Sequence, residues 1–207
     1  MPESFLLTAN LVILNAVKDL LLASSALPTV RAGSSSTYCY HSRVKIEPKG
    51  LRQESVQKSA TREELRTALR TVFLDRDGVL NRKMPEGQYV TGWGHFELLD
   101  GVPEAIARLN QAGLRVLVVT NQRGVALGLY SAADVDAIHA QLQQTLAQYG
   151  AHIDGFYFCP HDKRECNCRK PLPGLFEQAQ AQFPEIEPES SLIVGDSLSD
   201  IEFGRNL

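Results

Sequence analysis

The sequence predicts an α/β fold, built as a doubly wound parallel sheet with helices on both faces. Two observations lead to this fold class. Four short runs of residues are almost wholly apolar, which is typical of strands that a parallel sheet buries on both faces. Helical patterns alternate with these runs along the chain, and such alternation predicts a parallel sheet. The runs cover residues 72–74, 115–119, 155–158 and 192–194.

The three intervening segments carry helix signals. In the first, Ile106 and Leu109 fall on one side of the predicted helix and Gly113 marks its end. The second opens with a cap made by Ser131 and Asp134 and then repeats apolar residues at helical spacing. We therefore expect helices at residues 102–111, 131–149 and 174–183.

The chain has 207 residues, enough for one well-packed domain with some surplus. Its formal net charge is −3 and it contains no basic run, which argues against a nucleic-acid partner or a membrane-surface partner. We expect one domain at residues 69–207, incomplete at its C-terminal end, and a poorly structured leader and linker at residues 1–68. Within that leader, a capping-box pattern of Thr61 and Glu64 favours a short helix.

The N-terminal part gives no positive sign of secretion or membrane insertion. The apolar stretch at residues 5–17 is too short to span a membrane and is not preceded by the positive charge of a signal peptide. Residues 33–37 are typical of a linker. Cys39 stands alone and the other three cysteines crowd into one segment, whereas disulfide frameworks spread their cysteines along the chain. We therefore expect a cytoplasmic protein with no membrane partner.

Residues suited to catalysis follow each predicted strand, at the sheet edge where open α/β sheets bind ligands. Asp75 and Asp77 directly follow the first strand. A carboxylate can attack phosphorus to form an aspartyl-phosphate, and a second carboxylate can protonate the leaving oxygen. A divalent cation must then offset the repulsion between carboxylate and phosphate, and Mg²⁺ prefers such oxygen ligands. Taken alone, this pair of acids also fits a solvated turn.

Further polar residues extend this phosphate and metal site. Thr120 and Asn121 follow the second strand and can donate hydrogen bonds to phosphoryl oxygens, although Thr-Asn is also common in turns. Lys170 can supply a positive charge to the same oxygens. The alternative is a solvated surface residue, which is what a lone lysine usually is. Asp196 follows the fourth strand and is expected to complete the Mg²⁺ site. Asp200 is expected to orient a metal-bound water or a neighbouring side chain; both acids also fit a helix N-terminus.

A compact set of metal ligands follows the third strand. Its three thiols and one imidazole are the complete donor set of a closed tetrahedral Zn²⁺ site, so this metal is expected to be structural. The alternative is a redox-active or accidental cluster. Because Lys170 follows the last thiol so closely, zinc would fix the loop that carries this lysine. The four ligands are Cys159, His161, Cys166 and Cys168.

In their order and context, these motifs resemble those of the haloacid dehalogenase-like phosphatases, over residues 71–207. The motifs are Asp75-x-Asp77-Gly78, Thr120-Asn121, Lys170-Pro171 and Gly195-Asp196-x-x-x-Asp200. The resemblance implies a Rossmann-like core with Asp75 as the nucleophile. It also implies that Asp77 is the general acid/base and gives its main-chain carbonyl to Mg²⁺. The chain between Asp77 and Thr120 has no room for a cap domain, so specificity must come from the zinc loop and from residues 81–93.

The zinc loop narrows the resemblance to the branch that contains D-glycero-D-manno-heptose 1,7-bisphosphate phosphatase and the histidinol-phosphatase domain. Segments that look closer to the heptose enzymes are Asn81, Tyr89-Val90, Thr120-Asn121-Gln122-x-Gly124 and Arg169-Lys170-Pro171-x-Pro173-Gly174. This resemblance implies that Arg169 contacts the substrate and that Thr120 and Lys170 hold the transferred phosphoryl group. It also places Asn121 and Gln122 among the substrate-binding residues.

Three features depart from the heptose pattern: Arg123 in place of a small residue, Ser197 in place of lysine, and a short loop between His161 and Cys166. Members of the family also continue beyond Leu207 with another strand and helix. We therefore expect an exposed sheet edge, Ile201 and Phe203 without partners, and a poorly stable chain.

Together these observations predict a monomeric, Mg²⁺-dependent phosphomonoesterase with a structural Zn²⁺ site, acting on a small phosphorylated metabolite. The expected reaction removes the 7-phosphate of D-glycero-D-manno-heptose 1,7-bisphosphate through an aspartyl-phosphate. The alternatives are a histidinol-phosphate phosphatase and a non-catalytic, zinc-stabilised fragment.

Overall fold

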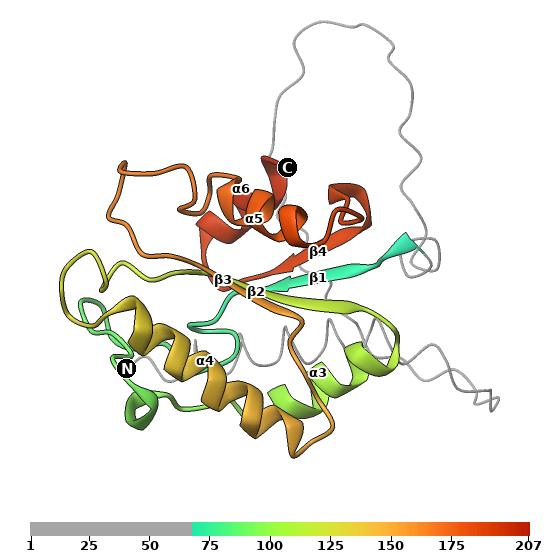
Figure 1. Ribbon diagram of the computed structural model, residues 1–207, viewed down its shortest axis with the longest axis horizontal. Coiled ribbons are helices and arrows are strands. Elements are labelled where there is room, and N and C mark those ends of the chain that lie inside the picture. Colours follow the sequence, from blue (N-terminus) through green and yellow to red (C-terminus); the bar gives the residue numbers. More distant parts are fainter. Residues whose placement is uncertain (1–67) are drawn as a thin grey trace, which may run out of the picture.

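Four parallel strands form one sheet, and helices cover both of its faces (Figure 1). The computed structural model describes residues 68–207. The strand order is β3-β2-β1-β4, so the predicted doubly wound fold is confirmed. The strands are β1 Thr71–Leu74, β2 Arg115–Asn121, β3 Gly155–Cys159 and β4 Ser191–Val194. The helices are α3 Val102–Gln111, α4 Ala132–Ala147, α5 Gly174–Gln182 and α6 Leu198–Arg205, with 3-10 turns η2 Trp93–His95 and η3 Pro188–Ser190.

Several expectations concern residues that lie outside this described part of the chain. They are the apolar stretch at residues 5–17, the linker at 33–37, Cys39 and the capping box of Thr61 and Glu64. None of the helices in residues 68–207 combines the length and the apolar composition that crossing a bilayer requires.

The two faces of the sheet carry separate apolar cores, because successive side chains of a strand point to opposite faces. Val72 and Leu74 of β1 belong to the core beneath α3 and α4, whereas Phe73 belongs to the core beneath α5 and α6. The same alternation runs through β2, where residues 116–119 are 0% exposed. Figure 1 shows α3 and α4 on one side of the sheet and α5 and α6 on the other. A strand buried on both faces needs a continuous apolar run, which is the pattern that predicted these strands.

The register of the sheet brings the ends of β1 and β4 together. Leu74 pairs with Val194 of β4 and with Val118 of β2, and the amide of Asp75 continues the ladder by donating to the Val194 carbonyl at 2.9 Å. β1 lies between β2 and β4 in the sheet. From β1 the chain adds β2 and β3 on one side, and β4 is then added on the other side of β1. The residue that follows β1, Asp75, therefore lies at the switch point where open α/β sheets bind their ligands.

Two helices begin with the same capping box. The Ser131 hydroxyl accepts from the Asp134 amide while the Asp134 carboxylate accepts from the Ser131 amide, as the sequence predicted for α4. Ser197 and Asp200 form the corresponding box at the start of α6, which begins right after the polar turn that follows β4. Local sequence thus fixes where α6 begins, and hence where Asp200 lies.

The expectation that Phe203 lacks partners is wrong. Phe203 is 0% exposed and belongs to the core that contains Phe73 and Leu117. It lies three residues after Asp200 on α6 and so shares the face of the helix that meets the sheet. Ile201 lies on another side of α6 and is 51% exposed. In the described residues β4 pairs only with β1, so its other edge is open, as expected.

Candidate active site

Three carboxylates meet at the switch point of the sheet. Asp75 follows β1, Asp196 follows β4 and Asp200 lies in the first turn of α6, and one oxygen from each lies within 4.8 Å of the others. Oxygen ligands at such spacing suit a Mg²⁺ ion, which needs only one or two carboxylates beside its waters. The side-chain oxygens of Asp77 are not part of this group, although its backbone lies two residues beyond Asp75.

Lys170 lies between two of these acids, Asp75 and Asp200. Its Nζ donates to Asp200 Oδ1 at 2.5 Å, to the Val119 carbonyl at 2.7 Å, and lies 3.0 Å from Asp75 Oδ1. An ammonium has three hydrogens, so these three acceptors fix its position. Lys170 is 3% exposed, and its buried charge is thereby paired. The lysine is held where a phosphoryl group attached to Asp75 would need a positive charge.

Burial controls the protonation of the nucleophile candidate. Burial raises the pKa of the Asp75 carboxyl to about 6, and the Lys170 ammonium acts in the opposite direction. The backbone amide of Arg76 also donates to Asp75 Oδ1 at 2.8 Å. A carboxyl with this pKa is mostly ionised at neutral pH and is poorly hydrated, both of which favour its reaction as a nucleophile.

A second lysine, Lys83, forms an ion pair with Asp196 at 2.7 Å. The residue comes from the loop after β1, and nothing in the sequence predicted this contact. Beside it, Gly78 has a φ of +92°, and a β-carbon there would overlap the Asp196 carboxylate. Glycine is therefore required at position 78 both by backbone conformation and by the close approach of this acid.

The Asp77 carboxylate is held by three side chains. Asn81 Nδ2 donates to Oδ1 at 3.0 Å, Gln122 Nε2 donates to Oδ2 at 2.8 Å, and Arg76 Nη2 contacts both oxygens at 3.2 and 3.0 Å. The Asp77 side chain is 28% exposed while that of Arg76 is 1% exposed. One side of the carboxylate thus stays open to solvent.

Asn121 is occupied by the backbone of the loop that carries Lys170. Its amide nitrogen donates to the Lys170 carbonyl at 3.1 Å, and its amide oxygen accepts from the Lys170 amide at 3.0 Å. Thr120 is 1% exposed and accepts from Gln122 through its hydroxyl. Thr120 and Asn121, predicted to follow the second strand, are the last two residues of β2. Asn121 therefore aligns the lysine through this paired hydrogen bond.

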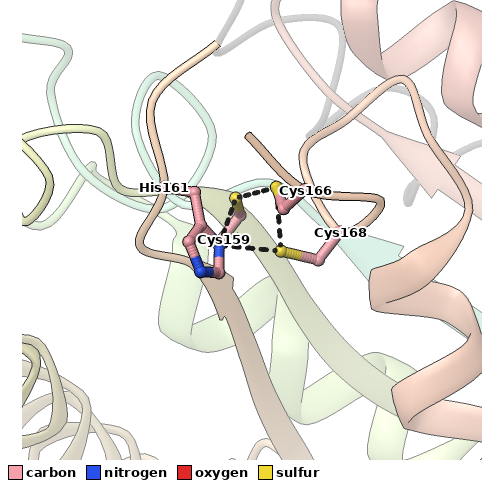
Figure 2. Close-up of side chains that lie close together, drawn as sticks. All are labelled: Cys159, His161, Cys166 and Cys168. Carbon is pink, nitrogen blue, oxygen red and sulfur yellow. Dashed lines mark hydrogen bonds between the residues drawn. The ribbon is translucent and has the colours of Figure 1, made fainter. Parts of the chain in front are cut away.

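The predicted metal ligands, which lie at the end of β3 and in the loop after it, face one another (Figure 2). The Cys166 sulfur lies 3.5 Å from that of Cys159 and 3.3 Å from that of Cys168, and His161 Nδ1 lies 3.3 Å from the Cys168 sulfur. All four donor atoms lie within 4.8 Å of one another. Burial raises the pKa of the Cys159 and Cys168 thiols, so a metal must displace their protons to bind. The donor types and their convergence fit a tetrahedral Zn²⁺ ion.

An ion pair ties this cluster to the loop after β2. Arg123 donates through Nε and Nη2 to both oxygens of Asp162, at 2.6 and 3.0 Å. The Arg123 guanidinium holds the pKa of the Asp162 carboxyl at about 2. Arg169 is half-buried nearby and donates to the His161 carbonyl at 3.4 Å. Arg123, one of the departures from the heptose pattern, thus has a structural partner in the cysteine-rich loop.

A cavity of about 230 Å³ opens beside Asp77. Residues 83–90 form one wall, and Asn121, Gln122 and Tyr130 form the other. The predicted specificity segment thus lines a real cavity. Trp93 and Phe96 stack on each other with ring centroids 4.9 Å apart, and neither residue lines the cavity.

The structure gathers the predicted site residues into two neighbouring groups, one acidic and one rich in thiols. Sequence reasoning missed Lys83, Tyr130 and the side chain of Arg76. For Arg76 a signal was present, because a charged residue two positions after a buried strand and between two acids must find a partner. Lys83 and Tyr130 carried no comparable signal.

Comparison with known proteins gives consistent matches. The sequence profile of haloacid dehalogenase-like hydrolases matches residues 27–207. The D-glycero-alpha-D-manno-heptose-1,7-bisphosphate 7-phosphatase of Mycobacterium tuberculosis is 49% identical over 137 residues, which cover 66% of this chain and 72% of that protein. The corresponding beta-heptose phosphatase of Bordetella bronchiseptica is 38% identical over 135 residues, covering 65% of this chain and 74% of that protein.

A solved structure agrees with these matches. The crystal structure of D,D-heptose 1,7-bisphosphate phosphatase from B. bronchiseptica, complexed with magnesium and phosphate, aligns with a TM-score of 0.62 and 37% identity. The alignment covers 67% of this chain and 76% of that one.

Proposed function

This chain belongs to the haloacid dehalogenase-like hydrolase family, and we propose that it removes the 7-phosphate of D-glycero-D-manno-heptose 1,7-bisphosphate. The prediction of a phosphatase of this family is confirmed by relatives that are 36–49% identical and are named as phosphatases. The substrate is our proposal. It is supported by the names of these relatives and by the cavity beside Asp77.

Asp75 of the acidic group and the neighbouring Asp77 can perform this reaction in two steps. The Asp75 carboxylate attacks phosphorus while Asp77 protonates the leaving oxygen, and Asp77 then takes a proton from the water that hydrolyses the aspartyl-phosphate. Lys170 places its charge beside Asp75 and can hold the phosphoryl oxygens. We propose that Thr120 and Arg169 contribute further hydrogen bonds to the substrate.

We propose that Asp75, Asp196 and the main-chain carbonyl of Asp77 hold a Mg²⁺ ion. The convergence of carboxylate oxygens at this point fits such an ion, and the related B. bronchiseptica structure contains magnesium and phosphate. When bound, Mg²⁺ would supply the positive charge that offsets the repulsion between Asp75 and the phosphate. Lys83 and Lys170 place ammonium groups beside the same acids, Asp196 and Asp75.

We propose that the cysteine-rich loop holds a structural Zn²⁺ ion through Cys159, His161, Cys166 and Cys168. The four donor atoms fit this metal and leave no donor position for a substrate. Bound zinc would stabilise the loop. Because Arg169 and Lys170 directly follow Cys168, the fold of this loop sets where the two cations lie.

The single observation that supports the reaction best is the placement of Lys170 between Asp75 and Asp200. A buried ammonium that contacts a nucleophile candidate and is fixed by a second acid has the arrangement that phosphoryl transfer through an aspartate requires. The same arrangement would serve histidinol phosphate, so the substrate must be decided by experiment. We further propose a monomeric, cytoplasmic enzyme whose phosphatase domain covers residues 69–207, with residues 1–68 as a leader.

The test is a comparison of substrates with Mg²⁺ present. We expect kcat/KM for the heptose 1,7-bisphosphate to exceed that for histidinol phosphate by at least about 100-fold, since a site built for one polar substrate rejects another by such factors. Both anomers should be assayed, the alpha anomer first, because the relative at 49% identity is named for it. A higher kcat/KM for histidinol phosphate would overturn the proposed substrate and leave the reaction type in place.

A further inference from the structure

We infer that Gln122 is a positioning residue: together with Arg76 and Tyr130, it holds the Asp77 carboxyl group in place for proton transfer to the leaving oxygen. This inference rests on the proposed function, because it concerns how the proton of that reaction is delivered. It also replaces the expectation that Gln122 binds the substrate.

The side-chain amide of Gln122 has no free hydrogen-bonding capacity. Its oxygen accepts from Arg76 Nη2 at 2.9 Å and from the Tyr130 hydroxyl at 2.8 Å. Its nitrogen donates to Asp77 Oδ2 at 2.8 Å and to Thr120 Oγ1 at 2.9 Å. These four contacts use both lone pairs and both hydrogens of the amide. Because a guanidinium only donates, the oxygen must be the atom that faces Arg76, and this fixes the orientation of the amide.

Arg76 supports the Asp77 carboxylate from the protein interior. Its side chain is 1% exposed, and Nη2 contacts both Asp77 oxygens and the Gln122 oxygen. A buried guanidinium is costly unless it is paired, and in the described residues Nη2 alone finds hydrogen-bond partners while Nε and Nη1 have none. Asp77 and Gln122 therefore provide the compensation for this buried charge. Asn81 adds a further donor to Oδ1 at 3.0 Å. Donors thus reach the carboxylate from the protein side, while its open side lines the cavity.

Tyr130 connects this arrangement to the start of α4. Its hydroxyl donates to Gln122, and its ring lies so close to Gly124 that a β-carbon there would overlap it. Ser131, the next residue, is the N-cap of α4. The network therefore joins three segments, which follow β1, follow β2 and precede α4. Each segment must be in place for Asp77 to be held.

The chemical consequence lies in the first step. The bond from the Asp75 oxygen to phosphorus forms as the bond from phosphorus to the leaving oxygen breaks. The proton on Asp77 passes to that oxygen, so the product leaves as a neutral alcohol. An alkoxide leaves poorly without this proton, whereas p-nitrophenolate leaves readily without it. A displaced Asp77 should therefore slow alkyl phosphates more than aryl phosphates.

The experiment compares kcat/KM for a sugar phosphate and for p-nitrophenyl phosphate in variants of the full chain with Mg²⁺. For Gln122→Met we expect the sugar phosphate to lose about 30-fold and the aryl phosphate about threefold, within the range that general acid catalysis contributes. Tyr130→Phe should also lower the ratio of kcat/KM for the sugar phosphate to kcat/KM for the aryl phosphate, by a few-fold. Tyr157→Phe is the matched control, because the Tyr157 hydroxyl also donates to a glutamine oxygen at 2.8 Å, that of Gln182 in α5. Its ratio should not change.

Asp77→Asn sets the scale, since it should give the largest change in the ratio. Adding Gln122→Met to Asp77→Asn should change the ratio no further, because both act through one group. Equal losses for the two substrates in Gln122→Met, or no loss in either, would overturn the inference.

Thermal melts check that each variant folds, and if Gln122→Met does not fold, Tyr130→Phe decides alone because it removes a single oxygen. If the wild-type chain turned over neither substrate, both the proposed function and this inference would be contradicted. A wild-type chain that is active while its Gln122 variant loses both substrates equally would remove only the inference.

Discussion

The acidic group and the thiol cluster lie at neighbouring strand ends, but the chain assembles them in different ways. The four thiol and imidazole donors come from one short segment, residues 159–168, which comprises the last residue of β3 and the loop after it. The acids come from three separate places, after β1, after β4 and within α6, and Lys170 reaches them from the loop of the thiol cluster. The first group depends on local chain geometry and the second on the topology of the whole sheet.

The two groups also differ in their charge compensation. In the acidic group, the ammonium groups of Lys170 and Lys83 already contact the carboxylates. In the thiol cluster, the four donor atoms face one another without such a cationic side chain between them in the described residues, and burial raises the pKa of Cys168. The acidic group should therefore keep its shape without a metal, whereas the loop of the thiol cluster should depend on one. Lys170 links the two, because it follows the loop and enters the acidic group.

The largest expected effect is the loss of activity in Asp75→Asn. An amide cannot form the aspartyl-phosphate, so phosphate release should fall by at least about 1,000-fold. Zinc content, measured by elemental analysis, should stay at the wild-type value, because Asp75 contributes nothing to the thiol cluster. Loss of zinc in this variant would show that the two groups are not separable.

Cys168→Ser tests the same comparison from the other side. We expect zinc to be lost and the free energy of unfolding to fall by about 3 kcal/mol, because metal binding and folding are coupled. Activity should fall as well, since Lys170 loses its fixed loop. Elemental analysis and a thermal melt check both points, and Cys39→Ser serves as the control for removal of a thiol elsewhere. Full activity without zinc would contradict the proposed link through Lys170.

Asp200→Asn should have a smaller effect on activity. The substitution removes one of the anions that fix Lys170 and keeps the size of the side chain, so kcat should fall by about 10-fold to 100-fold. The matched control is Asp134→Asn, because Asp134 occupies the corresponding position of the capping box on α4. Asp134→Asn should lower stability slightly, because it weakens the capping box of α4, and should leave kcat unchanged. Equal kcat losses in the two variants would show that the cap, and not the contact with Lys170, matters.

His139→Phe should give the smallest effect, confined to acid. Burial between Phe156 and Phe158 lowers the pKa of His139 to about 3, with the Arg76 charge as a further cause. The unfolded chain takes up this proton near pH 6.5, so the histidine favours folding above that pH and the advantage is lost as the pH falls. At pH 5 this loss amounts to about 2 kcal/mol.

Denaturant melts at pH 7.5 and pH 5 of the His139 variant and the wild type test this prediction. The variant should lose less stability between the two pH values, and what it still loses can then be assigned to zinc release and other groups. An identical pH dependence in both proteins would contradict the low pKa. The measurement thus separates acid effects in the core from acid effects in the thiol cluster.

Local patterns predicted the strands, three helices and the thiol cluster, because each depends on the spacing of residues within one segment. The acids after β1 and β4 were predicted to meet because parallel strands end at one edge of the sheet. The contacts of Lys83 and Tyr130 could not be predicted, since they depend on how side chains from distant loops pack. The prediction for Phe203 was wrong for a related reason. The sequence of α6 does not show by itself which face of this helix packs against the sheet.

The glycine at position 78 gives the site a vulnerability that a survey of its ligands would overlook. Any side chain there would push the Asp196 carboxylate out of its place, although every proposed metal ligand and both lysines would still be present. A homologue with a complete set of acids but a bulkier residue at this position should therefore be judged inactive. When active members are sought among related sequences, the space that a glycine leaves for the Asp196 carboxylate matters as much as the presence of the reactive groups.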